Sequence, residues 1–146
     1  MSSNADDEHS FAHQITVRWS DCDPARIAYT GRIPNFALEA IDAWWEHTIG
    51  LDWYRLNVDE DIGTPFVHLS MDFRKTITPR HKLMCFVKLI NLGNSSVRFS
   101  VVGKQDNQLC FEGEFVEAFV DAAILQKRGI PDKFRQILVE KLTVST

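Results

Sequence analysis

The sequence predicts an α+β fold in which an antiparallel sheet of about five strands wraps around one central helix, with a short helix near the end of the chain. Residues 35–49 are apolar around most of a helical circumference, which is typical of a buried helix. After residue 63 the chain alternates apolar and polar residues in runs separated by Gly and Asn turns, which indicates antiparallel strands. A single helix this apolar is buried best when the sheet curls around it.

The first strand is predicted over residues 13–19, where Ile15, Val17 and Trp19 alternate with polar residues. The stretch "SDCDPARIAYTG", residues 20–31, then breaks the pattern with Asp and Pro. The central helix follows and ends at Gly50, a natural helix stop. Residues 51–63 are predicted to be a connection.

Four more strands are predicted over residues 64–77, 82–92, 96–105 and 109–122, with turns at 92–96 and 105–108. In the first of these, one face carries Val67, Leu69, Met71 and Phe73, and the other carries Phe66, His68, Ser70 and Asp72. Gly113 inside the last strand predicts a bulge or a close backbone approach. Pro131 starts a short helix over residues 131–142 that packs Phe134, Ile137, Leu138 and Leu142.

The composition fits one globular domain. The chain has 146 residues, of which 45% are hydrophobic and 25% charged. We predict a flexible N-terminal tail over residues 1–10 and a single domain over residues 11–146.

Charge and cysteine content indicate the partners and the cellular compartment of the protein. The net charge of −4 provides no basic field for nucleic acid or an anionic membrane. The 3 cysteines suit reduced thiols better than a disulfide framework. The first ten residues lack the apolar region of a secretory signal, and no apolar run approaches the ~20 residues that span a bilayer. We therefore predict a cytoplasmic protein.

Residue patterns leave one candidate loop for chemistry. No His/Cys cluster has metal-ligand spacing, and neither a Gly-x-Ser-x-Gly elbow nor a phosphate-binding Gly loop occurs, so no metal site or cofactor is predicted. Asp21 and Asp23 remain. Both are compatible with a polar turn. However, they also precede a buried helix whose free N–H groups can stabilise an oxyanion, and a carboxylate in that position can act as a general base or nucleophile in acyl transfer.

The motif "VRWSDCDPARIAYTGRIPNF", followed by the apolar helix and by "GTPFVHLSMDF", resembles the 4-hydroxybenzoyl-CoA thioesterase group of hotdog-fold acyl-CoA thioesterases. The resemblance extends over residues 13–121 in motif and in element order. It implies a hotdog fold, with homodimers that join two sheets side by side, often as dimers of dimers, and with active sites at the dimer interface. The substrate would be an acyl-CoA, with coenzyme A as part of the substrate and no cofactor.

The resemblance also implies roles for individual residues. Asp23, directly before Pro24, would be the catalytic carboxylate, and Asp21 would orient the loop. A backbone N–H at Thr30, with Gly31 as second choice, would polarise the thioester carbonyl. Glu39 would lie near the acyl group or the attacking water. Residues assigned to substrate binding are Tyr29, Phe36, Thr64, His68, Arg74 and Lys75.

The sequence departs from the family pattern at three places. The run "YTGRIPNF" is longer than the family's usual run from the aromatic residue to Pro-Asn, so the oxyanion donor stays open between Thr30 and Gly31. Related bacterial thioesterases carry a His where this chain has Thr30, so a His-assisted mechanism is not expected. The basic run that grips the CoA phosphates would fall at "NLGNSS", which has no Lys or Arg. Candidates to replace it are Arg74, Lys75, Arg80, Lys82 and Arg98.

The sequence therefore predicts an acyl-CoA thioesterase that hydrolyses an aryl or a short- or medium-chain thioester. The alternatives are a thioesterase acting on acyl carrier protein, a hotdog dehydratase, and a non-catalytic module that binds acyl-CoA. The missing His at the start of the helix argues against the dehydratase.

Overall fold

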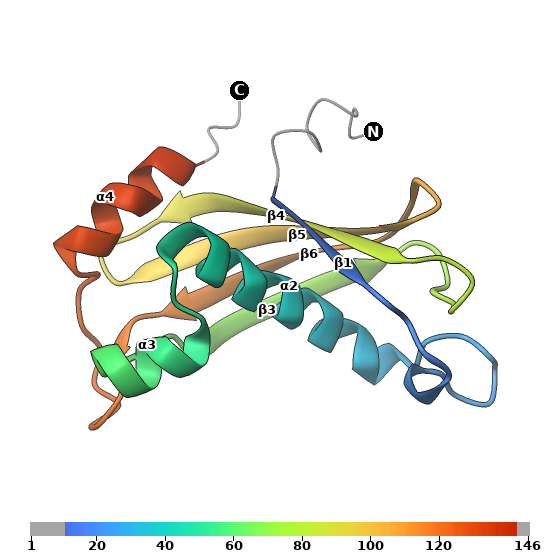
Figure 1. Ribbon diagram of the computed structural model, residues 1–146, viewed down its shortest axis with the longest axis horizontal. Coiled ribbons are helices and arrows are strands. Elements are labelled where there is room, and N and C mark those ends of the chain that lie inside the picture. The colour runs from blue at the N-terminus through green and yellow to red at the C-terminus, as the bar shows by residue number, and fades with distance from the viewer. Residues whose placement is uncertain (1–10, 143–146) are drawn as a thin grey trace.

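The computed structural model describes residues 11–142, so the tail predicted over residues 1–10 lies outside the described part. Five strands form one antiparallel sheet in the order β1-β4-β5-β6-β3, and helix α2 lies against one of its faces (Figure 1). The strands are β1 Phe11–Ile15, β3 Phe66–Phe73, β4 Leu83–Leu92, β5 Ser96–Gln105 and β6 Gln108–Ala118. The predicted α+β architecture with a central helix is confirmed.

The three inner strands follow the predicted meander. Buried residues alternate with half-buried ones along β4, from Leu83 to Leu89, as expected for a sheet with one covered face. Asp106 and Asn107 have φ values of 50° and 60°, so they form the tight turn that joins β5 to β6. Gly113 makes the close approach predicted for it, because an added Cβ would lie 2.5 Å from the carbonyl oxygen of Ser70.

Helix α2, Ile33–Ile49, is the central helix, and it begins two residues before the predicted start. Its core-facing residues are Ile33, Phe36, Ala37, Ala40, Ile41, Trp44 and Trp45. Gly50 ends it with a φ of 87°, as predicted. Since α2 packs against β1, β4 and β5, it covers the part of the sheet face that lies nearer to β1 than to β3.

The prediction for the first strand was wrong at its end. β1 stops at Ile15, although Val17 is still buried. The chain then turns into a short 3-10 helix, η1 Trp19–Asp21, and the side chain of Trp19 is 73% exposed instead of buried. Alternation predicts burial only while the backbone stays extended, and here it does not.

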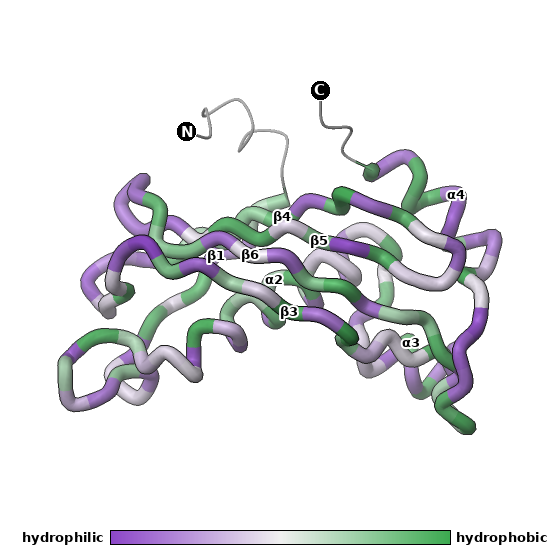
Figure 2. The backbone as a smooth tube through the Cα atoms, turned by 180° about the vertical axis from the view of Figure 1, so that it is seen from behind, coloured by the Kyte–Doolittle hydropathy of each residue, from purple (hydrophilic) through white to green (hydrophobic). Residues whose placement is uncertain are grey.

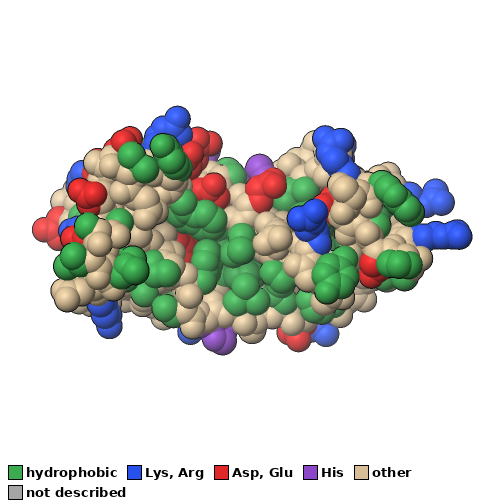
Figure 3. Space-filling model, turned by 90° about the horizontal axis from the view of Figure 1, so that it is seen from below, with side chains coloured by type: hydrophobic (Ala, Val, Ile, Leu, Met, Phe, Trp, Pro, Cys, Tyr) green, Lys and Arg blue, Asp and Glu red, His purple; other side chains and the backbone are tan. Residues whose placement is uncertain are grey.

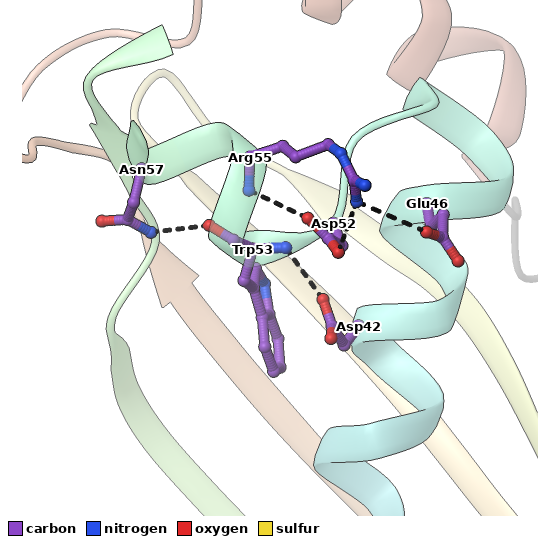
Figure 4. A network of polar contacts seen from close by, with 6 residues as sticks. All are labelled: Asp42, Glu46, Asp52, Trp53, Arg55 and Asn57. Carbon is purple, nitrogen blue, oxygen red and sulfur yellow. Dashed lines mark hydrogen bonds and ion pairs between the residues drawn. The ribbon is translucent and has the colours of Figure 1, made fainter. Parts of the chain in front are cut away.

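The predicted connection over residues 51–63 contains regular structure. It holds helix α3, Trp53–Glu60, and strand β2, Ile62–Gly63, which pairs with β7, Val120–Asp121. Asp52 caps α3 by accepting a hydrogen bond from the Arg55 backbone N–H at 2.9 Å. Asp42 of α2 accepts the Trp53 backbone N–H at 2.9 Å, which ties α3 to the central helix (Figure 4).

The edge strand β3 exposes apolar side chains. Its pairing with β6 puts Leu69, Met71 and Phe73 opposite Phe115, Gly113 and Phe111, on the side that faces α2. This confirms the predicted alternation, except that a bulge near Val67 shifts the start of the strand. Leu69 and Phe73 are nonetheless 43% and 48% exposed. Hydrophobic side chains accordingly gather along the middle of the face formed by α2 and β3 (Figure 3).

The last element, α4 Asp132–Lys141, follows Pro131 as predicted and buries Phe134 and Leu138, while Ile137 and Leu142 are half-buried. It lies at the end of the sheet away from the β5–β6 turn (Figures 1 and 2). Within residues 11–142, no helix has both the length and the apolar character needed to cross a membrane.

Candidate active site

The loop between β1 and α2 folds through a tight turn at Asp23. The Asp23 carbonyl accepts the Arg26 N–H at 2.9 Å, and the Asp23 N–H donates to the Ile27 carbonyl at 3.0 Å. Pro24 fits the second position of such a turn because its φ is fixed. Cys22 and Ala28 form a bridge that closes the loop. The motif therefore builds a small rigid hairpin and not an open coil.

The Asp23 side chain is held at one oxygen only. Oδ1 accepts the Ala25 N–H at 2.8 Å, the usual bond of an Asp that starts a turn. The residue is half-buried, and across the described residues 11–142 neither a cation nor a second donor bonds to its other carboxylate oxygen. An ordinary polar turn thus accounts for the hydrogen bond at Oδ1. Within the described residues, Oδ2 has no partner.

Asp21 makes the contacts of a residue that fixes the loop. Its Oδ2 accepts the Arg18 N–H at 2.8 Å, and its Oδ1 pairs with Arg32 Nε at 3.0 Å. Its backbone carbonyl also accepts the Tyr29 N–H at 2.9 Å. One side chain therefore joins the segment after β1 to the start of α2. It also forms the ion pair of Arg32, the arginine at the start of the helix.

The helix start presents open N–H groups. A 3-10 turn, η2 Thr30–Arg32, runs directly into α2, and the Arg32 N–H is already bonded to the Tyr29 carbonyl at 2.8 Å. Among the hydrogen bonds of the described chain, the N–H groups of Thr30 and Gly31 have no acceptor. Gly31 lets the Tyr29 ring lie over the turn, because an added Cβ would be 2.6 Å from Tyr29 Cε2.

Glu39 is paired with a residue that sequence reasoning missed. Its Oε2 lies 2.7 Å from His13 Nε2 on β1, which is the edge of the sheet opposite β3. No contact joins Glu39 to the Asp23 loop within the described residues. Sequence separation hid this pair, since the two residues are 26 positions apart and meet only when β1 packs along α2.

The residues assigned to substrate binding fall in different places. Phe36 and Thr64 are buried in the folded chain, at 5% and 8% exposure, whereas Tyr29 is exposed beside the loop. His68 is exposed on β3, opposite Val116, on the sheet face that points away from α2. Tyr29 is joined to the loop by the bond from its N–H to the Asp21 carbonyl. Within the described residues, no contact joins Phe36, Thr64 or His68 to Asp23.

The two cations at the end of β3 have different partners. Arg74 pairs with Glu112 at 3.2 Å and with Asp72 at 3.8 Å, so its charge is compensated. Lys75 donates to the side-chain oxygen of Gln108, which is neutral.

A buried carboxylate at the other end of α2 was also missed. Glu117 on β6 is 0% exposed and accepts the indole N–H groups of Trp45 at 3.1 Å and of Trp53 at 3.2 Å. Thr64 bonds to it as well. Burial raises the pKa of Glu117 to about 7, against the effect of these three donors. Alternation along β6 could have revealed it, because Glu117 shares the buried face of Phe115 and Phe119.

This pKa predicts a pH-dependent stability. Between pH 4.5 and about 7 the folded state keeps the Glu117 proton that the unfolded chain has released, so the free energy of unfolding falls as pH rises through this window. The expected fall is on the order of 3 kcal/mol. Urea unfolding at pH 5 and pH 8 should show a smaller fall for Glu117→Gln than for the wild type. Equal falls for both proteins would contradict the assignment.

Over residues 11–142, no group of three or more His, Cys, Asp or Glu side chains is arranged to hold a metal ion. The loop between β1 and α2 offers instead a carboxylate at Asp23, open backbone N–H groups at Thr30 and Gly31, and the aromatic ring of Tyr29.

Comparison with known proteins gives the family. The sequence profile of the thioesterase-like superfamily matches residues 17–138. The chain belongs to this superfamily. A thioesterase superfamily structure from Jannaschia sp. CCS1 is 45% identical, with a TM-score of 0.89 over 92% of this chain and 94% of that chain. No curated protein sequence matches the chain.

More distant solved structures share the fold. A 1,4-dihydroxy-2-naphthoyl-CoA thioesterase from Synechocystis is 17% identical, with a TM-score of 0.80 over 90% of this chain and 96% of its own. A DHNA-CoA thioesterase from Staphylococcus aureus is 11% identical, with a TM-score of 0.81 over 92% and 97%. The predicted hotdog fold is thus confirmed. The matched part of this thioesterase-like chain includes the Asp23 loop, α2, β3 to β6 and most of α4.

Proposed function

We propose that this superfamily member is an acyl-CoA thioesterase of the 4-hydroxybenzoyl-CoA thioesterase-like group. The observation that carries the proposal is the Asp23 carboxylate, which is half-buried, unpaired at one oxygen and set just before a helix whose first N–H groups are open. Asp23 acts as general base on a water that attacks the thioester carbonyl, or attacks the carbonyl itself to form an acyl intermediate that water then hydrolyses. The Thr30 or Gly31 N–H stabilises the oxyanion, and coenzyme A leaves as the thiolate.

Aryl thioesters are the first substrates to test. The names of two structural relatives specify an aryl-CoA substrate for those proteins, 1,4-dihydroxy-2-naphthoyl-CoA and gentisyl-CoA. In this chain the exposed Tyr29 beside the loop, and Leu69 and Phe73 on β3, supply apolar surface that an aryl group can contact. No metal or redox cofactor takes part in the proposed reaction.

The donor of the acyl group separates the proposal from its rivals. The same acyl group would be supplied on coenzyme A and on acyl carrier protein, and thiol release would be measured for each. We expect faster release from coenzyme A. Faster release from carrier protein would assign the carrier-protein thioesterase instead, and saturable binding of acyl-CoA without release would assign a binding module.

We further propose that a second copy of the chain pairs with β3. This edge strand has unpaired backbone groups on one side and exposes Val67, Leu69 and Phe73, at 64%, 43% and 48%. Exposed apolar edges of this kind are normally covered. Pairing of two β3 strands would continue the sheet from one copy into the next and place the active sites at their interface.

A charge on this edge should separate the two copies. Leu69→Lys is expected to shift the protein from dimer to monomer in analytical ultracentrifugation, because the new ammonium would have to be desolvated at the interface. Val139→Lys, on the exposed face of α4, introduces the same charge elsewhere and should leave the dimer intact. A monomeric wild type, or a Leu69→Lys dimer of unchanged affinity, would contradict the proposed interface.

A further inference from the structure

A polar cavity of about 340 Å³ lies at the end of the sheet that carries the Asp23 loop. The β3–β4 connection, residues 74–82, forms one wall, and the β5–β6 turn forms the other. Its lining consists of Lys75, Thr76, Thr78, His81, Gln105, Asp106, Gln108 and Cys110. The size is within the range of small-ligand sites, and most of its lining is able to hydrogen-bond.

The connection is unusually basic for a chain with a net charge of −4. It contains Arg74, Lys75, Arg80, His81 and Lys82 and no acidic residue. Arg74 is neutralised by its two carboxylates. By contrast, among the ion pairs of the described chain, none involves Lys75, Arg80 or Lys82; Lys82 donates to the Thr16 hydroxyl instead. Three cations therefore lack a carboxylate, and the one carboxylate in the lining is Asp106 at the turn.

A buried glutamine fixes one wall of the cavity. The side chain of Gln105, 6% exposed, accepts the Thr78 N–H at 3.0 Å and donates to the carbonyls of Thr78 at 2.7 Å and His81 at 2.8 Å. All three bonds run from β5 to the connection that covers it. The wall with the cations is thus fixed before any ligand arrives, which lowers the entropy cost of binding.

The cavity is joined directly to the candidate catalytic loop. The Ala28 N–H donates to the Ile77 carbonyl at 2.7 Å, and Ile77 sits between two lining residues, Thr76 and Thr78. Asp23 lies five residues before Ala28, on the other strand of the small hairpin. The basic cavity therefore adjoins the loop that carries Asp23, so a ligand whose reactive end lies at Asp23 can extend into the cavity.

We propose that this cavity binds the phosphorylated nucleotide end of the coenzyme A thioester, with Lys75, which lines it, as a phosphate ligand. The inference rests on the proposed function for the identity of the substrate. Phosphate oxygens form strong charge-assisted hydrogen bonds with ammonium and guanidinium groups, and Thr and Gln side chains supply further donors. Arg74 is excluded from this role because its charge is already bound.

Lys75→Gln tests the site against a matched control. It should raise KM for an acyl-CoA about tenfold and leave kcat unchanged, because the contact is the same in the ground and transition states. KM for the same acyl group on pantetheine, which has no phosphate, should not change. Lys133→Gln removes the same charge on α4, at the opposite end of the sheet, and should change neither value. An unchanged KM for acyl-CoA in Lys75→Gln would overturn the proposal.

Direct binding separates this inference from the proposed function. Calorimetric titration with coenzyme A should show about tenfold weaker binding to Lys75→Gln, whether or not any thioester is hydrolysed. A smaller loss with 3′-dephospho-coenzyme A would assign Lys75 to the 3′-phosphate, and an equal loss would assign it to the pyrophosphate. If wild type hydrolyses no thioester but binds coenzyme A through Lys75, the site stands and the proposed function fails. Equal binding by wild type and variant would overturn the site alone.

Discussion

Asp23→Asn should lower kcat for thioester hydrolysis by at least about 100-fold, since a placed general base or nucleophile typically contributes factors of 10² to 10⁴. Asparagine has the same shape and keeps an oxygen that can accept the Ala25 N–H, so the turn should persist. It cannot take up a proton from water or form an acyl intermediate as a carboxylate does. The melting temperature should therefore stay within about a degree or two of the wild-type value.

Steady-state thiol release, with the protein folded as judged by circular dichroism, measures this effect. Asp132→Asn is the control, because it removes an exposed carboxylate at the start of α4, away from the loop. It should retain wild-type kcat. An Asp23→Asn variant that kept more than half of the wild-type kcat would remove Asp23 from the mechanism.

Glu117→Ala should lower the free energy of unfolding by about 3–5 kcal/mol, the largest stability effect we expect from one substitution. The change leaves the indole N–H groups of Trp45 and Trp53 without their acceptor and opens a cavity between α2, α3 and β6. Thr64 loses its partner in the same step. One carboxylate holds three segments of the chain together, so its loss is felt in each of them.

The measurement is best made below the pKa of Glu117. At pH 5.5 the wild-type carboxyl is largely protonated, so the variant gains little from removal of a buried charge. Urea unfolding at one fixed protein concentration gives the difference. Glu114→Ala, on the same strand, removes an exposed ion pair with Arg98 and should cost less than about 1 kcal/mol. A loss below 1 kcal/mol for Glu117→Ala would show that the buried network is dispensable.

Local patterns predicted the fold where neighbouring residues decide the structure. The apolar circumference of α2, the glycine at its end and the turn at Asp106 and Asn107 all depend on short stretches, and all are found as expected. Helix α3 was missed because its eight residues bury only Leu56, which leaves almost no periodic signal. The cap at Asp52 and the bond from Asp42 hold it in place, and the second of these requires α2 to be positioned first.

The candidate site was predicted less completely than the fold. The Asp-Pro motif identifies Asp23 as a candidate, but it does not show that one carboxylate oxygen of Asp23 is unpaired. That depends on Arg32, which pairs with Asp21 in the folded chain. In the same way, Arg74 and Lys75 are equivalent in sequence and differ through residues of another strand, Glu112 and Gln108. Contacts across long sequence separations therefore determined which of the charged residues are available for binding or chemistry.

Thiol release by the wild-type protein, measured with aryl-, short-chain and long-chain CoA thioesters, decides between a thioesterase and a binding module. We expect catalysed hydrolysis of at least one thioester, with the highest kcat/KM for an aryl substrate, and loss of that activity in Asp23→Asn. If the folded protein binds these thioesters but releases coenzyme A from none of them, the proposed function is wrong and the chain is a hotdog module that binds acyl-CoA without reacting with it.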